Sequence, residues 1–196
     1  MPTMLAPFLS FYTPTYRRPE QLQACMESVR QQTAVADVEQ IVVPDHVGLG
    51  VGGMFERVPR YAAALHGRYV HFLCDDDILA SPNAVARVRL QAGAEDYPDV
   101  MIVGSQKPGG MFPSANEGPP VLGSIDLGCF IVERSVWTEF AHCYGRRYEG
   151  DFDFISHLWE VSREGREWAG LRWSWHRELH FVTGAASRGR YEGQWP

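Results

Sequence analysis

Residues 67–79 read G-R-Y-V-H-F-L-C-D-D-D-I-L, an apolar run that ends in three consecutive aspartates, Asp75, Asp76 and Asp77. The apolar part, residues 69–74, has the length and composition of a buried β-strand. Three adjacent carboxylates at a strand end repel one another, so a fold that holds them together needs a cation or hydrogen-bond donors beside them. Oxygen ligands of this kind suit Mg²⁺ or Mn²⁺. The alternative is an acidic turn that complements the dipole of the next helix.

Strands and helices alternate on both sides of this stretch. We expect strands over residues 7–13, 38–43, 100–103 and 125–132 and within residues 171–182. We expect helices that begin at Pro19 and at Ser81-Pro82, and over residues 55–66, 133–144 and 151–163, with a break or start near Pro59. Ser81 is the expected N-cap and Pro82 the first residue of its helix. Residues 48–53 and 106–123, rich in glycine or proline, are expected to be loops. The alternation predicts an α/β fold with a mostly parallel central sheet flanked by helices.

The net charge, the apolar stretches and the cysteines of the sequence disfavour several classes of function. The 196 residues include 18 basic and 24 acidic side chains, a net charge of −6, which disfavours binding to nucleic acid or an anionic membrane. No apolar stretch approaches the roughly 18 residues of a membrane-spanning helix, and the first residues lack a secretory signal pattern. The four cysteines have no paired spacing and are expected to be free thiols. We therefore expect a cytoplasmic protein.

Four segments together resemble family 2 glycosyltransferases of the GT-A fold, in order and in spacing. They are F-Y-T-P-T-Y-R-R-P at residues 11–19, I-V-V-P-D at 41–45, the stretch at 67–79, and G-D-F-D-F at 150–154. The resemblance covers most of the chain from Phe8 to about His157 and is to the small, soluble, bacterial or phage type. It implies transfer of a sugar from a UDP-, dTDP- or GDP-sugar to an acceptor hydroxyl, with Mn²⁺ or Mg²⁺. The acceptor would be a glycan, a lipid-linked sugar or a small molecule, with nucleic acid less favoured.

The resemblance also implies roles for individual residues. Asp76 and Asp77 would bind the metal, and Asp151 would be the general base of an inverting reaction, although an ordinary helix-capping role for Asp151 stays open. The nucleotide would be bound by Thr13, Pro14, Thr15, Tyr16, Asp45, Arg57, Arg60 and Asp75. Two positions depart from the family pattern: Cys74 stands where the family commonly has aspartate, and Pro44 replaces the first of two acids.

Acceptor binding is expected from the later part of the chain, through Asp126, Trp175 and His176. Five of the six tryptophans lie beyond residue 150, interspersed with arginines, which suits stacking on sugars but equally suits core packing. A structural role stays open for His176, and a turn role for Asp126. We expect one catalytic domain over residues 1–196, with a nucleotide-sugar-binding half at 1–104, an acceptor-binding half at 105–183 and a C-terminal tail at 184–196.

Two other functions stay open. A sugar-nucleotide nucleotidyltransferase would normally show a glycine-rich basic signature after the first strand, and residues 13–19 contain no glycine. A non-catalytic nucleotide-sugar-binding protein is the second alternative, because the acidic motif is altered and the chain is short for this fold.

Overall fold

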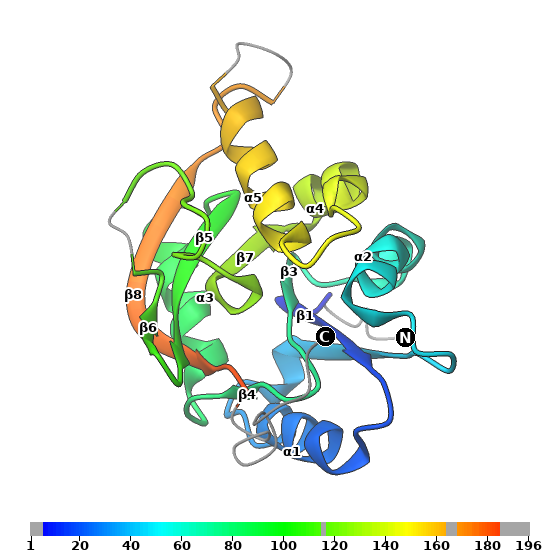
Figure 1. Ribbon diagram of the computed structural model, residues 1–196. Helices are drawn as coiled ribbons and strands as arrows, with labels where there is room; N and C mark the ends of the chain where they lie inside the picture. Colours follow the sequence, from blue (N-terminus) through cyan, green and yellow to red (C-terminus); the bar gives the residue numbers. More distant parts are fainter. Residues whose placement is uncertain (1–5, 115–116, 164–167, 185–196) are drawn as a thin grey trace.

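The computed structural model describes residues 6–114, 117–163 and 168–184 (Figure 1). Most of the expected C-terminal tail lies outside these residues, as do Arg166 and Trp195 of the tryptophan- and arginine-rich segment. One sheet has the strand order β2-β1-β3-β7-β5-β8-β4, with β6 paired to β5. The strands are β1 Leu9–Thr15, β2 Val38–Pro44, β3 Tyr69–Phe72, β4 Ile78–Leu79, β5 Val100–Lys107, β6 Gly110–Phe112, β7 Phe130–Glu133 and β8 Trp173–Val182. The α-helices are α1 Pro19–Arg30, α2 Gly50–Tyr61, α3 Ala84–Ala94, α4 Arg134–Phe140 and α5 Gly150–Val161. Short 3₁₀ helices are η1 Val35–Asp37, η2 Ala62–Ala64, η3 Leu127–Cys129 and η4 Ala141–Cys143.

The central sheet is mixed. Strand β1 pairs in parallel with β2 and β3, and β5 pairs in parallel with β8. Strand β7 lies antiparallel between β3 and β5, and β6 and β4 are antiparallel to β5 and β8. The predicted α/β class with flanking helices is confirmed, and the insertion of β7 adds antiparallel pairings that the sequence pattern did not indicate.

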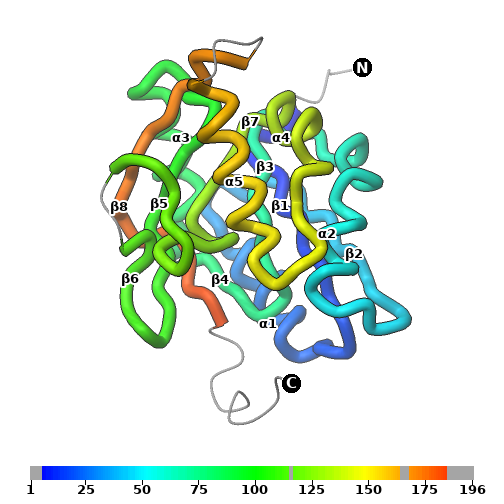
Figure 2. Tube along the Cα trace, turned by 45° about the horizontal axis from the view of Figure 1, so that its top comes forward, coloured from blue at the N-terminus to red at the C-terminus, as the bar shows by residue number. Residues whose placement is uncertain are grey.

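Helices cover both faces of the sheet (Figures 1 and 2). On one face, α2, α4 and α5 enclose an aromatic core in which Tyr144 stacks between Phe55 and Phe154, with ring centroids 5.2 and 4.2 Å away. On the other face, α1 and α3 pack apolar side chains such as Val29 and Val85 against the strands. Among the described residues, none of the helices has the length and apolar character needed to cross a membrane.

The expected helix entry at Ser81-Pro82 is wrong. Helix α3 begins at Ala84, after Asn83. The backbone carbonyl of Ser81 accepts a hydrogen bond from Gln32 Nε2 (2.8 Å), and that of Pro82 accepts one from the Thr33 amide (2.8 Å). These bonds fix the two residues against the end of α1, so the helix starts two residues later.

The expected loop over residues 48–53 is wrong for residues 50–53, because α2 already begins at Gly50 and continues through Pro59 to Tyr61. Glycine suits this first turn for a packing reason: a Cβ on Gly52 would overlap the carbonyl of Arg146. The 106–123 segment is also more regular than expected, because β5 runs on to Lys107 and turns back into β6. The strand expected over residues 125–132 begins only at Phe130, after η3.

Candidate functional site

A cavity of about 740 Å³ lies beyond the carboxyl ends of β1, β2 and β3. This is where ligands bind in open α/β sheets. Sequence reasoning had singled out nine of the residues that line it: Pro14, Thr15, Tyr16, Asp45, Asp75, Asp76, Asp77, Asp126 and Asp151. The polar residues that follow the predicted strands therefore indicated the position of the cavity correctly.

The cavity is acidic. Among the described residues that line it are seven carboxylates and two cations, namely Asp45, Asp75, Asp76, Asp77, Asp126, Glu149 and Asp151 against Arg18 and Lys107. Carboxylates gathered at this density favour a bound cation, since they otherwise repel one another.

Asp77 is the most enclosed member of the acidic motif, with 2% of its surface exposed. Its Oδ1 accepts a hydrogen bond from the Gly184 amide (2.8 Å), and its Oδ2 accepts one from the Cys74 amide (3.3 Å). Burial, with the neighbouring charge of Asp76, raises the pKa of Asp77 to about 7. A cation beside this carboxyl group would favour its ionised form.

Arg18 stands beside the other two aspartates. Its Nη1 lies 3.2 Å from Asp75 Oδ1 and 3.4 Å from Asp76 Oδ2. Burial nevertheless raises the pKa of Asp75, against the opposing effects of Thr15 and Arg18. Arg18 therefore offsets part of the repulsion within the motif.

The donor atoms present fit a divalent cation. Cys74 Sγ and one carboxylate oxygen from each of Asp76 and Asp77 lie within 4.8 Å of one another. The two carboxylates are hard oxygen ligands of the kind that Mg²⁺ and Mn²⁺ take. Cys74, which the sequence marked only as a departure from the family pattern, therefore lies beside the two proposed metal ligands.

Asp45 organises the loop between β2 and α2. Its carboxylate accepts hydrogen bonds from the amides of Val47 (3.0 Å), Gly48 (3.1 Å) and Leu49 (2.6 Å), and Arg57 Nη2 lies 3.6 Å away. Desolvation acts to raise the pKa of Asp45, but these bonds and Arg57 outweigh it, so the pKa lies below its ordinary value. The carboxylate thus stays charged while it shapes one wall of the cavity.

Tyr16 packs directly on this loop. A Cβ built on Gly48 would lie 2.7 Å from Tyr16 Cζ, and Gly48 has φ +77°, a left-handed conformation that favours glycine. The close approach of ring and backbone sets the position of Tyr16 at the cavity wall.

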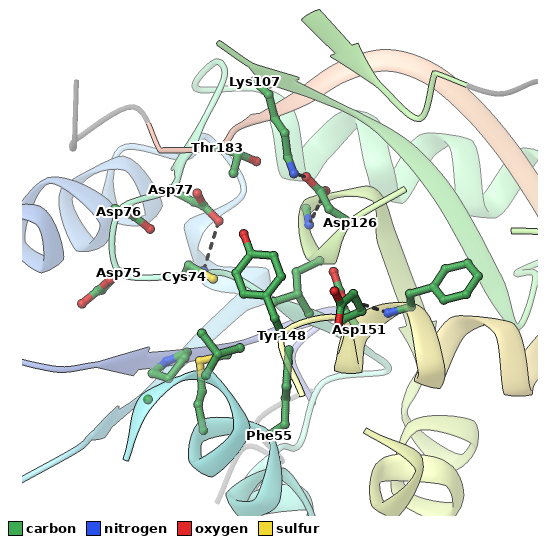
Figure 3. A pocket seen from close by; sticks show the side chains of 18 of the residues that line it. Phe55, Cys74, Asp75, Asp76, Asp77, Lys107, Asp126, Tyr148, Asp151 and Thr183 are labelled. Atoms are coloured by element: carbon green, nitrogen blue, oxygen red, sulfur yellow. Dashed lines mark hydrogen bonds and ion pairs between the residues drawn. The ribbon is translucent and has the colours of Figure 1, made fainter. Parts of the chain in front are cut away.

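Asp151 lies in the first turn of α5, on the wall opposite the acidic motif (Figure 3). Its Oδ1 accepts the Phe152 amide hydrogen bond (2.9 Å), and the Leu127 amide also donates to its carboxylate. The N-cap residue of the helix is Glu149, so Asp151 does not occupy the capping position. Burial raises the pKa of Asp151 in spite of these donors, which moves it towards the range of a general base.

Five of the expected site residues do not line this cavity; one of them, Arg57, lies behind it as the partner of Asp45. Thr13 is buried and accepts a hydrogen bond from Gln40 (3.0 Å), and Arg60 lies outside the lining. Trp175 and His176 belong to the beginning of β8, whereas the cavity is reached by Thr183, just beyond its end. At about 3.3 Å per residue, Trp175 lies roughly 25 Å along the strand from Thr183. Trp175 instead lines a second pocket together with Trp159 and Trp173, and His176 Nε2 lies 3.5 Å from Glu95.

Sequence reasoning missed Lys107, Tyr148 and Thr183, which all line the cavity. Lys107 forms an ion pair with Asp126. The available signal was that Lys107 is the only lysine in the chain. Tyr148 and Thr183 carried no comparable signal. Tyr148 precedes α5 and Thr183 follows β8, and only the folded structure shows that these positions reach the cavity.

The fold is of the GT-A glycosyltransferase type. The mannosyltransferase PcManGT from Pyrobaculum calidifontis, in complex with GDP-Man and Mn²⁺, matches with a TM-score of 0.60 and 11% identity over 94% of this chain and 59% of that one. S. aureus TarS 1–349 matches with a TM-score of 0.59 and 12% identity over 89% of this chain and 59% of that one. The structure of TarS 1–349 in complex with UDP-GlcNAc matches with a TM-score of 0.57 and 13% identity, over 89% of this chain and 57% of that one. This chain thus spans less than two thirds of the length of each. No family model matches the chain, and neither does any curated protein.

Proposed function

We propose that this protein is a metal-dependent glycosyltransferase that moves a sugar from a nucleotide-diphosphate sugar to an acceptor hydroxyl. The observation that carries the proposal is the placement of the acidic motif and Asp151 on opposite walls of one cavity, in a fold shared with a mannosyltransferase bound to GDP-Man and Mn²⁺. In this cavity, the diphosphate of the donor would lie at the acidic motif, and the hydroxyl group of the acceptor would lie at Asp151.

The donor's nucleoside would lie against Tyr16 and the loop held by Asp45, with Pro14 and Thr15 beside it. Arg57 supports this wall through Asp45 and through the Pro44 carbonyl (3.2 Å). Asp75 completes the donor site with Arg18 as its partner. Thr13 and Arg60, which do not line the cavity, are left out of the proposed contacts.

Asp76 and Asp77 would hold Mn²⁺ or Mg²⁺, with Cys74 beside them. When bound, such a cation offsets the negative charge that develops on a diphosphate leaving group. Without it, the seven carboxylates of the cavity would oppose binding of an anionic donor.

Asp151 would accept the proton of the acceptor hydroxyl as that oxygen attacks the anomeric carbon. Its position across the cavity from the acidic motif supports attack on the face opposite the leaving group, which would invert the configuration. Asp126 and Tyr148 flank the space next to Asp151 and are the proposed acceptor contacts, in place of Trp175 and His176.

A thermal-shift panel of UDP-, dTDP- and GDP-sugars, with and without Mn²⁺, tests the donor class, because a ligand of the native state raises its melting temperature. We expect a metal-dependent rise with one donor class. A labelled donor then tests turnover: release or transfer of the sugar supports the enzyme, whereas binding without turnover across an acceptor panel supports a non-catalytic binding protein. Asp151→Asn should abolish transfer. The matched control is Asp153→Asn, two residues on, where the carboxylate pairs with Arg147 and does not line the cavity.

A further inference from the structure

The single lysine of the chain, Lys107, lines the cavity and is partly buried. Lys107 ends β5 and pairs with the carboxylate of Asp126, and its ammonium lies 4.8 Å from the ring centroid of Phe112 on β6. Figure 3 shows Lys107 reaching down to Asp126, with Asp151 on the same side of the cavity. The charge is therefore held on the same side of the cavity as the proposed base, on a side chain that is 29% exposed.

Asp126 connects this lysine to a tight turn. Its Oδ1 accepts the Gly128 amide hydrogen bond (3.0 Å), and its backbone carbonyl accepts the Cys129 amide hydrogen bond (2.9 Å). The turn packs closely on its surroundings, since a Cβ on Gly128 would lie 2.8 Å from Ser105 Oγ and 2.9 Å from Thr183 Oγ1. Leu127, inside this turn, directs its amide at Asp151. The donor to Asp151 is thus fixed by a carboxylate that Lys107 holds in place.

We propose that Lys107 is a positioning residue for Asp151, acting through Asp126 and the Leu127 amide and through its own positive charge. This inference rests on the proposed function of Asp151 as general base. Lys107 differs from the residues proposed to contact the donor because its ammonium pairs with Asp126, although its charge also acts on Asp77.

The groups that surround Asp151 support a role for the lysine charge. Burial raises the pKa of Asp151, and Lys107 acts in the opposite direction. The Cys129 thiol and the Tyr144 phenol also face this carboxylate, and burial raises the pKa of both, so they are neutral near pH 7. On α5 itself, the charge of Asp153 is paired with Arg147. Removing the lysine charge should therefore favour protonated Asp151, which cannot accept a proton.

Kinetics of Lys107→Met and Lys107→Arg test this proposal. We expect Lys107→Met to lower kcat by about tenfold to a hundredfold, as small displacements of a catalytic group do, with the donor KM little changed. In Lys107→Met, the acidic limb of the kcat–pH profile should move to higher pH. Lys107→Arg, which keeps the positive charge, should bring this limb most of the way back to its wild-type pH. A higher donor KM with unchanged kcat would instead make Lys107 a donor-binding residue and overturn the proposal.

A second readout needs no turnover. Reductive ¹³C-methylation labels the α-amino group and Lys107, the only lysine, whose methyl resonances report the charge of neighbouring groups. We expect these resonances to follow a pH step that disappears in Asp151→Asn and persists in Asp153→Asn. Lys107→Arg, which lacks the resonances, identifies them. A wild-type titration without an Asp151-dependent step overturns the coupling. Absence of sugar transfer by the wild type would refute the proposed function separately, whatever the resonances show.

Discussion

His71, in β3, makes the fold sensitive to acid. Its side chain is fully buried, stacked on Phe181 with ring centroids 4.0 Å apart, and its Nδ1–H donates to the Phe130 carbonyl (2.9 Å). Burial lowers the pKa of His71 from 6.5 to about 4, against the opposing effect of the Phe130 hydrogen bond and with a smaller contribution from His180. The folded protein therefore keeps this imidazole neutral at pH values where the unfolded chain protonates it.

The size of the effect follows from the two pKa values. A group whose pKa is depressed by folding contributes stability that is present above its unfolded pKa, 6.5, and is lost as the pH falls towards its folded pKa, about 4. Between pH 8 and pH 5 this loss amounts to about 2 kcal/mol. For a chain of this size it lowers the melting temperature by roughly 4–8 °C.

Urea unfolding followed by tryptophan fluorescence measures this loss. We compare wild type with His71→Gln, whose amide retains a donor for the Phe130 carbonyl, at pH 8 and pH 5. The wild type should lose about 2 kcal/mol more than the variant over this interval. His142→Gln, an exposed control, should retain the wild-type pH dependence. Equal losses in wild type and His71→Gln would refute the reasoning.

Three further predictions concern packing, backbone and metal. Phe154→Ala removes the ring stacked on Tyr144 and should cost about 3–5 kcal/mol in urea unfolding, and a cost below about 1 kcal/mol would contradict the packing. Gly48→Ala places a Cβ at φ +77° against Tyr16, so it should lower the free energy of unfolding by about 1 kcal/mol and weaken donor binding in a titration. Unchanged donor affinity would argue against Tyr16 as a nucleoside contact. Removing metal with EDTA should abolish the donor-induced rise in melting temperature, and added Mn²⁺ should restore it. An equal rise in EDTA would contradict metal-assisted donor binding.

The first part of the fold was predictable because its signals are local. Pro19 begins α1 as its fixed φ allows, and the apolar runs of β1, β2 and β3 end where polar residues follow. The position of β7 was not predictable, since its pairing of Val132 with Val70 of β3 joins residues far apart in the sequence. The start of α2 depends likewise on tertiary contacts, with Asp45 satisfying the preceding amides and Arg146 packing on Gly52.

The same distinction holds for the candidate site. Tyr16, Asp45 and the three aspartates were found because the carboxyl ends of parallel strands meet at one edge of a sheet. Lys107 was missed because the sequence pattern ended its strand at Val103, four residues before β5 ends. Trp175 was misplaced because composition marks an aromatic segment without showing which end of β8 reaches the cavity.

The product of the reaction tests the central claim most directly. Wild-type protein is incubated with Mn²⁺, the donor that raises its melting temperature and a panel of hydroxyl-bearing acceptors, and NMR reads the anomeric configuration of the product. We predict an inverted glycoside from wild type and from Asp153→Asn, and none from Asp151→Asn. A product with retained configuration, or near-normal turnover by Asp151→Asn, would contradict the account.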